Sequence, residues 1–295
     1  MKKGCRTTLL IIVLVGFVCG MGLLAIVIFL AGGGSEMWAF PSRESVAILD
    51  VQGAIFDNSD ILKQLKEYAD NSSVKAIVVR VDSPGGAVAP SQEIYEGLKR
   101  AKEKGKKVVV SMGAVAASGG YYVACAADEI YANPGTITGS IGVIAEFPNL
   151  QGLMDKVGIK FEIIKSGLYK DTGSPFRPMT PAEQELLQSM LMDVYNQFVE
   201  AVAEGRRMPI EEVKKYADGR IFSGRQGLEY GFVDALGTQS DAIKRAATLA
   251  GIKGEPRIIK KSKRRFPFGE LGESLLHQYF PATQSSYAPV LYQLR

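Results

Sequence analysis

The chain has 295 residues, of which 46% are hydrophobic, and a formal net charge of +4. This length suits one large domain or two small ones with a buried core. Its basic charge is concentrated in Lys2, Lys3 and Arg6 and in the run KKSKRR at 260–265, and the remainder is net negative. That balance excludes a basic face for nucleic acid. We interpret the 260–265 run as solvated surface, with contact to anionic lipid as the alternative.

The N-terminal region, residues 1–31, predicts a short cytoplasmic segment and a transmembrane anchor. Residues 9–31 contain no charged side chain, and a helix of this length spans about 34 Å, enough for a bilayer core. The basic residues precede this span, so we expect a cytoplasmic N-terminus and an extracytoplasmic domain at the cell membrane. The sequence AGGGS that follows leaves a cleaved signal peptide as the alternative.

Three further regions follow the anchor. We predict a linker at 32–45, one large folded domain at 46–252 and a C-terminal extension at 253–295. The three cysteines form no disulfide framework, because Cys5 and Cys19 lie before or within the span. We expect Cys125 to be a small buried hydrophobe.

Strands and helices are predicted to alternate through the first part of the domain. The expected strands are 46–53, 74–82, 107–113, 129–134, 141–146 and 160–167, and the expected helices are 60–70 and 91–105, the latter with Ser91 as N-cap. The β-branched run at 74–82 is typical of a strand buried on both faces. The alternation predicts an α/β fold with parallel pairing.

The chain becomes helical after residue 180. Thr180 as N-cap, Pro181 and Glu183 form a capping-box pattern at the start of a helix over 181–206. Shorter helices are expected at 210–217, 224–230 and 239–250, followed by a strand and an extended tail.

A single histidine limits the chemistry. His277 lies in the C-terminal tail, where we expect it to pack rather than to complete a Ser-His-Asp triad. No metal-ligand spacing, Walker A motif or dinucleotide fingerprint is present, so we predict neither metal nor cofactor. The base of any enzyme here is then a lysine, aspartate or glutamate.

Two glycine-containing turns are candidates for catalysis. In GAVAASGGYY (113–122), Ser118 follows a strand and opens a helix, so it is either a nucleophile or an N-cap residue. The N–H of Gly119 is a candidate oxyanion donor. In VDSPGG (81–86), the N–H of Gly85 or Gly86 could supply the second donor, or the stretch is an ordinary turn.

A serine nucleophile then needs a base. IIKSGLYKDTGSPFRPMT (163–180) offers Lys165 on an expected strand and Lys170 in the following loop, where a surface pair with Asp171 is the alternative. A lysine base must be neutral, which requires its pKa to fall from about 10.4 to about 7 through burial away from carboxylates. Ser140, in NPGTITGSIGV (133–143), could orient the amine or could be a turn residue.

Taken together and in their order along the chain (VDSPGG, GAVAASGGYY, GTITGSIGV and SGLYKDTGSPFRPMT), the four motifs resemble the short form of signal peptide peptidase A. The resemblance continues through GRIFSGRQGLEYGFVDALGTQSDAI (219–243) and covers roughly residues 46–252. It implies a serine–lysine dyad peptidase on the Clp protease/crotonase fold, a spiral of β-β-α units. It also implies a homo-oligomeric ring that shares dyads between subunits and degrades apolar remnant signal peptides at the membrane.

The resemblance also assigns roles to residues of this chain. It implies the following set: Ser118 as nucleophile, Lys170 as general base, Ser140 orienting the lysine, and Gly85 or Gly86 with Gly119 as oxyanion donors. Because a carboxylate beside the base would raise the pKa of the lysine, we expect the Asp171 side chain to point away from Lys170.

Other functions fit parts of the pattern. They are a membrane serine protease of the stomatin-operon type with regulatory substrates, a crotonase-like acyl-CoA enzyme, and a non-catalytic scaffold ring. The end of the tail, YAPVLYQLR, is apolar enough to dock on a neighbouring subunit.

Overall fold

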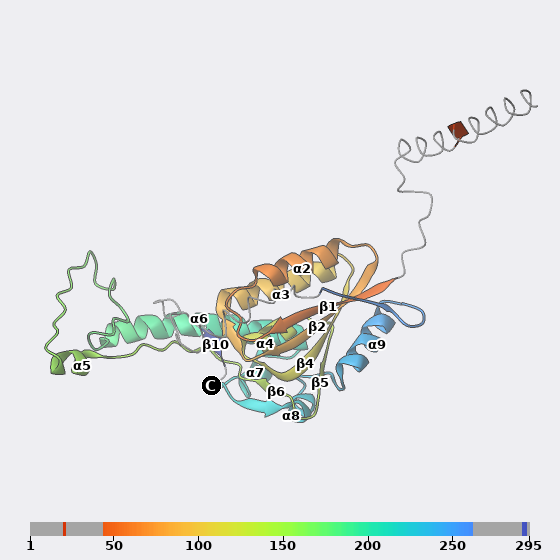
Figure 1. Cartoon of the computed structure of the whole chain (residues 1–295). Coiled ribbons are helices and arrows are strands. Elements are labelled where there is room, and N and C mark those ends of the chain that lie inside the picture. The colour runs from red at the N-terminus through yellow and green to blue at the C-terminus, as the bar shows by residue number, and fades with distance from the viewer. Residues whose placement is uncertain (1–19, 22–43, 262–290, 294–295) are drawn as a thin grey trace, which may run out of the picture. The chain divides into compact units, whose positions relative to one another are not determined.

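The computed structural model describes residues 20–21, 44–261 and 291–293 (Figure 1). The chain divides into two units, Met1–Arg43 and Glu44–Arg295, and the second unit carries the fold. The predicted anchor, apart from residues 20–21, and His277 lie outside the described residues. Within the described part, no helix has the length and apolar character needed to cross a membrane.

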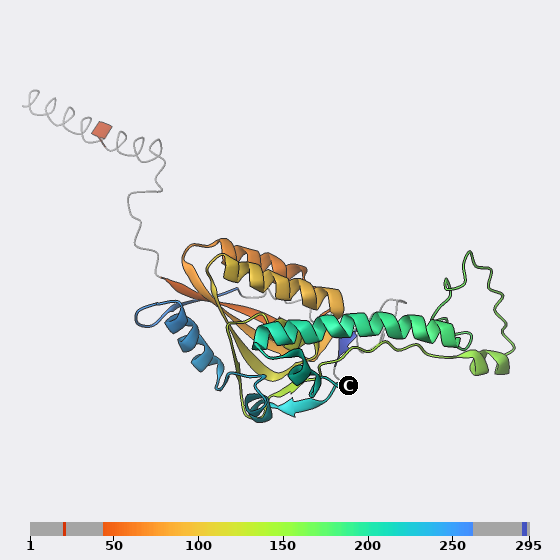
Figure 2. The same ribbon diagram turned by 180° about the vertical axis from the view of Figure 1, so that it is seen from behind.

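A largely parallel sheet of eight strands forms the centre of this unit (Figures 1 and 2). Its strands are β1 Ser45–Gln52, β2 Val74–Ser83, β4 Lys107–Ala117, β5 Glu129–Ala132, β6 Ile137–Gly139, β7 Ile221–Ser223, β8 Ala235–Leu236 and β9 Arg257–Lys260. The order is β7-β6-β4-β2-β1-β9, and β5 pairs with β4 and β8. Among the described pairs of this sheet, β6 with β7 is the antiparallel one. This architecture confirms the predicted α/β class.

Helices cover both faces of the sheet, so its central strands β1, β2 and β4 are mostly apolar and largely buried. One face carries α2 Ser59–Asp70, α3 Val88–Glu103, α4 Gly119–Ala124 and the second half of α6 Pro181–Arg206. The other face carries α9 Gln239–Leu249, whose alanines 242, 246 and 247 pack on Val46, Val78 and Val109. Two short helices, α7 Ile210–Lys214 and α8 Gly224–Glu229, complete the domain.

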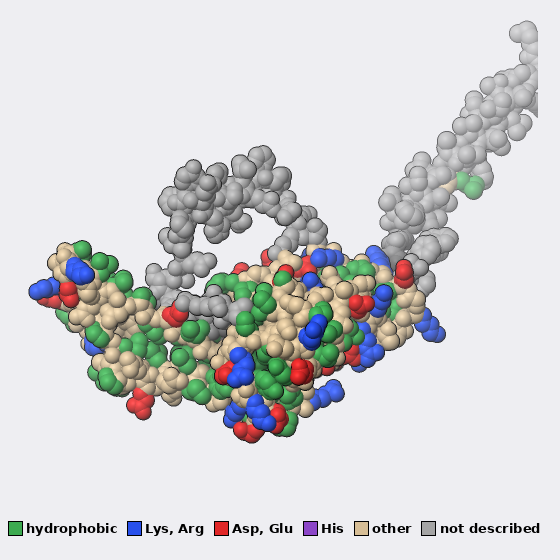
Figure 3. Space-filling model, turned by 90° about the horizontal axis from the view of Figure 1, so that it is seen from below, with side chains coloured by type: hydrophobic (Ala, Val, Ile, Leu, Met, Phe, Trp, Pro, Cys, Tyr) green, Lys and Arg blue, Asp and Glu red, His purple; other side chains and the backbone are tan. Residues whose placement is uncertain are grey.

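The first half of α6 extends beyond the sheet as part of an arm, which we define as residues 145–192 (Figure 2). The arm also contains α5 Gln151–Lys156. The predicted capping box starts α6: Thr180 Oγ1 accepts from the N–H of Glu183, and the Glu183 carboxylate accepts from the N–H of Thr180. Hydrophobic side chains are spread over the surface of the arm (Figure 3), and Ile164 is fully exposed.

Three predicted local features are wrong. No strand forms at 141–146 or 160–167, because the chain leaves the sheet soon after the backbone hydrogen bonds that join Ser140 and Ile141 to Arg220 and Gly219. Lys165 therefore lies in a loop. Helix α3 begins at Val88, and Ser91 lies inside it with its Oγ donating to the Ala87 carbonyl. Cys125 is buried as predicted, and burial raises the pKa of its thiol to about 12.

A second, two-stranded sheet lies at the end of β2. Strand β3 Gly85–Ala87 pairs antiparallel with β10 Leu291–Gln293, so Gly86 lies opposite Tyr292. A parallel bridge with Ile55 lines the other edge of β3. The C-terminal segment of the chain thus occupies one edge of the predicted oxyanion strand.

Candidate active site

Ser118 occupies a sharp turn between β4 and α4. Its backbone has φ 52° and ψ −119°, a conformation that favours glycine over residues with a Cβ. Its N–H donates to the Gly139 carbonyl at 2.8 Å, and its own carbonyl accepts from the N–H of Tyr122 at 2.8 Å. The sheet on one side and the helix on the other therefore hold the serine in a strained conformation, a feature that clusters at functional sites.

The Ser118 hydroxyl is buried and unpaired. The residue is 1% exposed, and its Oγ has no hydrogen-bond partner among the described residues. Leaving a buried hydroxyl unpaired costs about 1–3 kcal/mol, so such groups are rare. The side chain also makes no capping bond to α4, which removes the N-cap alternative. An unpaired Oγ on a strained backbone fits a nucleophile that lacks its base.

The two glycine-containing turns lie together. Ser83, at the end of β2, pairs in register with Ala116 of β4. A Cβ on Gly120 would lie 2.8 Å from the Ser83 carbonyl oxygen, so α4 can start here because that position has no side chain. Gly119, the buried first residue of α4, is therefore close to the SPGG turn.

Within the SPGG turn, the two candidate glycines differ. The N–H of Gly85 donates to Ser83 Oγ at 3.1 Å. Ile55 bonds to the Gly85 carbonyl and to the N–H of Ala87, so by strand alternation the peptide groups of Gly86 face the opposite edge. A Cβ on Gly86 would lie 2.3 Å from the Ile55 oxygen. The close approach of Ile55 therefore requires glycine at position 86. The N–H of Gly86 faces the other edge of β3, which pairs with β10.

Ser140 directly follows Gly139, whose carbonyl accepts the hydrogen bond from the N–H of Ser118. It also has a positive φ, 52°, and its N–H donates to the Arg220 carbonyl at 2.8 Å. Ser140 lines a cavity of about 790 Å³ together with polar Gln188, Asp218 and Arg220, and most of its walls are apolar: Val143, Ile144, Leu191, Met192, Tyr195 and Ile221. The structure therefore brings Ser118 and Ser140 to one region, beside an apolar cavity.

Lys170 lies elsewhere, on the arm. Its side chain is exposed, and it makes no side-chain hydrogen bond or ion pair with any residue that the structure describes. Its backbone N–H donates to the Gly167 carbonyl at 3.2 Å. A single chain therefore does not bring Lys170 to Ser118 or Ser140.

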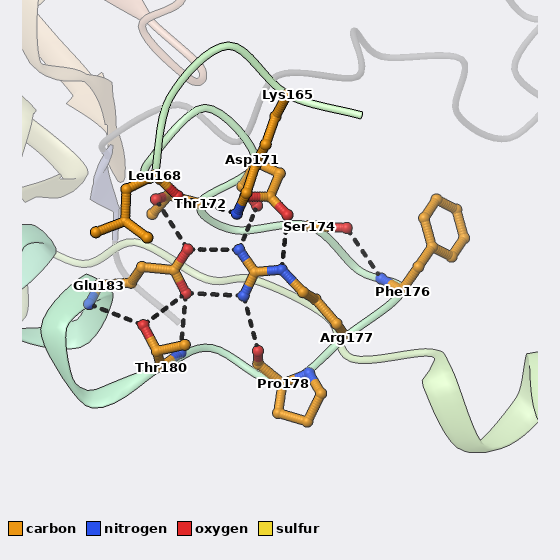
Figure 4. Close-up of polar contacts among 10 residues, drawn as sticks. All are labelled: Lys165, Leu168, Asp171, Thr172, Ser174, Phe176, Arg177, Pro178, Thr180 and Glu183. Carbon is orange, nitrogen blue, oxygen red and sulfur yellow. Dashed lines mark hydrogen bonds and ion pairs between the residues drawn. The ribbon is translucent and has the colours of Figure 1, made fainter. Parts of the chain in front are cut away.

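The carboxylate of Asp171 points to other cations, as predicted (Figure 4). Its Oδ1 accepts from Lys165 Nζ at 2.6 Å and its Oδ2 from Arg177 Nε at 2.7 Å. The hydrogen bonds from Arg177 and then from Lys165 hold the pKa of Asp171 well below its usual range. The surface pair between Lys170 and Asp171 does not form.

Arg177 also binds Glu183, the capping residue of α6 (Figure 4). Glu183 is 2% exposed, and the hydrogen bond from Arg177, followed by that from the N–H of Thr180, lowers its pKa to about 2. Sequence reasoning identified Glu183 as a capping residue and Lys165 as a lysine on an expected strand, but it assigned no role to Arg177 and no carboxylate partner to Lys165. Those two belong to the motif at 163–180, and nothing in their spacing showed which carboxylates they bind.

Comparison with known proteins decides the family. The model of peptidase family S49 matches residues 100–253, and that of Clp protease matches residues 43–136. The chain belongs to peptidase family S49. This S49 chain is accordingly a serine peptidase, and its parallel-rich sheet is consistent with the Clp protease fold. The acyl-CoA enzyme and the non-catalytic scaffold are thereby set aside.

Relatives of the S49 chain carry matching names. A protein of Synechocystis sp. that is named as a protease is 50% identical over 220 residues, which are 73% of this chain and 79% of that one. Protease 4 of Haemophilus influenzae is 34% identical over 76% of this chain and 37% of its own. The chloroplastic serine protease SPPA of Arabidopsis thaliana is 35% identical over 69% of this chain and 30% of its own. The last two relatives are thus much longer than the matched region.

Proposed function

We propose that this S49 peptidase cleaves apolar peptides with a serine–lysine dyad formed by Ser118 of one copy and Lys170 of a neighbouring copy. The observation that carries the proposal is the buried, unpaired Oγ of Ser118 on a strained turn. The exposure of Lys170 on an arm that extends beyond the sheet supports the participation of a second copy.

In the proposed reaction, the neutral amine of Lys170 takes the proton of Ser118 Oγ as that oxygen attacks the peptide carbonyl. The N–H groups of Gly119 and of the SPGG turn stabilise the negative oxygen that develops, and Gly86 fits this role better than Gly85. Lys170 then protonates the leaving amine, and a water molecule hydrolyses the acyl-enzyme by the reverse proton path. Ser140 holds the lysine amine in line.

The proposed substrates are signal peptides left in the membrane after secretory processing, and the proposed assembly is a homo-oligomeric ring. The apolar walls of the cavity beside Ser140 suit hydrophobic side chains. The charge-free stretch 9–31 would anchor the catalytic domain outside the cytoplasm, at the membrane. In cells that lack this protein, remnant signal peptides should accumulate, and restoring Ser118→Ala should not clear them.

Mixing two inactive variants tests the shared dyad. Ser118→Ala and Lys170→Ala should each lose at least about 10³-fold in kcat/KM on a fluorogenic apolar peptide. When equal amounts of the two are dissociated and reassembled together, about a quarter of the sites should contain both residues in a ring that mixes at random. The mixture should then recover activity. The exposed arm residue Lys160 provides the control, because Lys160→Ala should remain active alone. If mixing restored nothing, the dyad would lie within one chain.

A further inference from the structure

The arm holds Lys170 through a cluster of charged residues that links its loop to the start of α6. We define this cluster as Lys165, Asp171, Arg177 and Glu183 (Figure 4). Arg177 is central to it. Its Nε donates to Asp171 Oδ2, its Nη1 to the Pro178 carbonyl and to Glu183, and its Nη2 to the Asp171 carbonyl and to Glu183.

Every N–H donor of Arg177 is therefore engaged, since a guanidinium has five. The planar fork binds the Glu183 carboxylate in a bidentate manner and reaches Asp171 with its remaining edge. A lysine at this position has a single point charge and cannot reproduce both contacts. The cluster thus depends on the shape of arginine as well as on its charge.

Glu183 is bound more extensively than helix capping requires. A capping box needs two contacts with Thr180: its N–H donates to the Glu183 carboxylate at 2.9 Å, and its Oγ1 accepts from the N–H of Glu183 at 3.3 Å. Glu183 also accepts from both terminal nitrogens of Arg177 and from Thr172 Oγ1 at 3.2 Å. The buried carboxylate therefore fastens the segment just after Lys170 to the first turn of a long helix.

The residues on both sides of Lys170 are held in the same way. Thr172 binds Glu183, and Asp171 binds Arg177 through both its side chain and its carbonyl. Lys165 Nζ donates to the Leu168 carbonyl at 3.0 Å and to Asp171. Within this fixed loop, Lys170 is the cation left without a carboxylate among the described residues.

We propose that Arg177 is a positioning residue for the base: it fixes the Lys170 loop on α6 and keeps the Asp171 carboxylate away from the Lys170 amine. This inference rests on the proposed role of Lys170. Without Arg177, Asp171 would keep the bond from Lys165 to Oδ1, but its Oδ2 would lose its partner and become free to pair with the neighbouring ammonium. That pairing would favour the charged form of the lysine, which cannot accept a proton.

A pH–rate profile of the full-length enzyme tests the proposal with the same fluorogenic peptide. The charged groups around Lys170 are Lys165, Asp171, Arg177 and Glu183. Arg177→Gln should shift the acid limb of kcat by about one pH unit toward alkaline pH and lower kcat at neutral pH about tenfold. KM should change little, because the substrate does not contact Arg177 in this scheme. Arg245→Gln is the matched control, since Arg245 binds Glu129 in a similar bidentate pair on α9.

A second substitution separates positioning from general loosening of the arm. In Arg177→Gln combined with Asp171→Asn, no carboxylate remains to pair with Lys170, so the acid limb should return to its wild-type position. A limb that stayed alkaline in the double variant, or that did not move in Arg177→Gln, would overturn the inference. If Arg177→Gln did not fold, Arg177→Lys, which cannot hold Asp171 and Glu183 together, should produce a smaller alkaline shift, and an unmoved limb would again overturn the inference.

Failure of the inference is distinguishable from failure of the proposed dyad. If Lys170→Ala retained activity, Lys170 would not be the base, whatever Arg177 did. If Lys170→Ala were inactive and Arg177→Gln had a wild-type profile, the dyad would stand and the positioning role of Arg177 would be wrong.

Discussion

At the scale of single residues, the site depends on backbone conformations that most side chains avoid. Ser118 and Ser140 both have a φ of 52°, and Gly139 between them has φ 81°. Strain of this kind costs about 1–3 kcal/mol per residue and persists when the surrounding structure enforces it. Here the parallel pairing of β4 with β6 enforces it.

Replacing Ser118 with glycine should therefore stabilise the protein while inactivating it. Glycine adopts φ 52° and ψ −119° without a Cβ clash, and the gain outweighs the added freedom of the unfolded chain. We expect Ser118→Gly to unfold with about 1 kcal/mol more free energy than Ser118→Ala in a urea titration. Equal stability of the two variants would show that the turn is not strained.

Gly86→Ala should damage both stability and catalysis. Its Cβ would meet the backbone of Ile55 at 2.3 Å, so β3 must move, at a cost of about 2–4 kcal/mol. We expect kcat to fall about 10²-fold as the oxyanion donor shifts. Gly135→Ala is the control, because a Cβ there meets no heavy atom within 4 Å. A fully active Gly86→Ala would exclude this strand from the oxyanion site.

At the scale of elements, the pairing of β10 with β3 places the C-terminal segment where an extended peptide would add as a strand. On the edge of β3 that faces away from Ile55, the N–H and carbonyl of Gly86 are the main-chain groups that such a peptide could bind. A peptide and β10 cannot both use these groups.

A chain shortened by residues 291–295 should consequently bind peptides more tightly. With the edge of β3 free, we expect KM for an apolar peptide to fall about two- to tenfold and kcat to stay within twofold. Tyr292→Pro, which removes one N–H of β10, should have a smaller effect in the same direction. An unchanged KM in steady-state assays of both variants would mean that peptides bind elsewhere.

The contacts of Glu183 within the charged cluster should make the stability of the protein depend on pH in the acid range. Because the pKa of Glu183 is lowered to about 2 by Arg177 and Thr180, its contribution to stability is fully present above about pH 4.3, the ordinary value. That contribution is lost as the pH falls through about 2. In urea titrations at pH 7, 5 and 3, the stability difference between wild type and Glu183→Gln should be constant at the first two and smaller at pH 3. A difference that grew on acidification would contradict this assignment.

At the scale of the whole molecule, the arm presents apolar side chains that nothing in the described chain covers. Ile164 is fully exposed, so a single copy gains no stability from it. A contact with a second copy would bury this side chain. It would also bring Lys170 toward the Ser118 site of that copy.

Ile164→Asp should for this reason weaken assembly but leave the fold intact. We expect a smaller species in analytical ultracentrifugation, activity that is lost on dilution, and unchanged urea unfolding. Ile210→Asp is the control, because Ile210 is exposed on α7, away from the arm. Wild-type sedimentation of Ile164→Asp would exclude this part of the arm from the contact.

The fold class, the capping box of α6 and the burial of Cys125 were predictable because each follows from local pattern. The strands expected at 141–146 and 160–167 were not, because Ile141 packs in the core without strand pairing and the apolar residues of 160–167 lie on the surface of the arm. The arm itself depends on contacts far apart in the sequence or outside the chain. The same holds for Arg177, whose partners are set by the folded loop and not by spacing.

The separation of Ser118 from Lys170 within one chain has a consequence for the cell that makes this enzyme. If Lys170 serves a neighbouring copy, a newly made chain is a complete fold but an incomplete peptidase, and it cannot cut other proteins before it meets another copy. Proteolysis would then begin with assembly, at a threshold set by the local concentration of chains, and no propeptide would be needed to delay it.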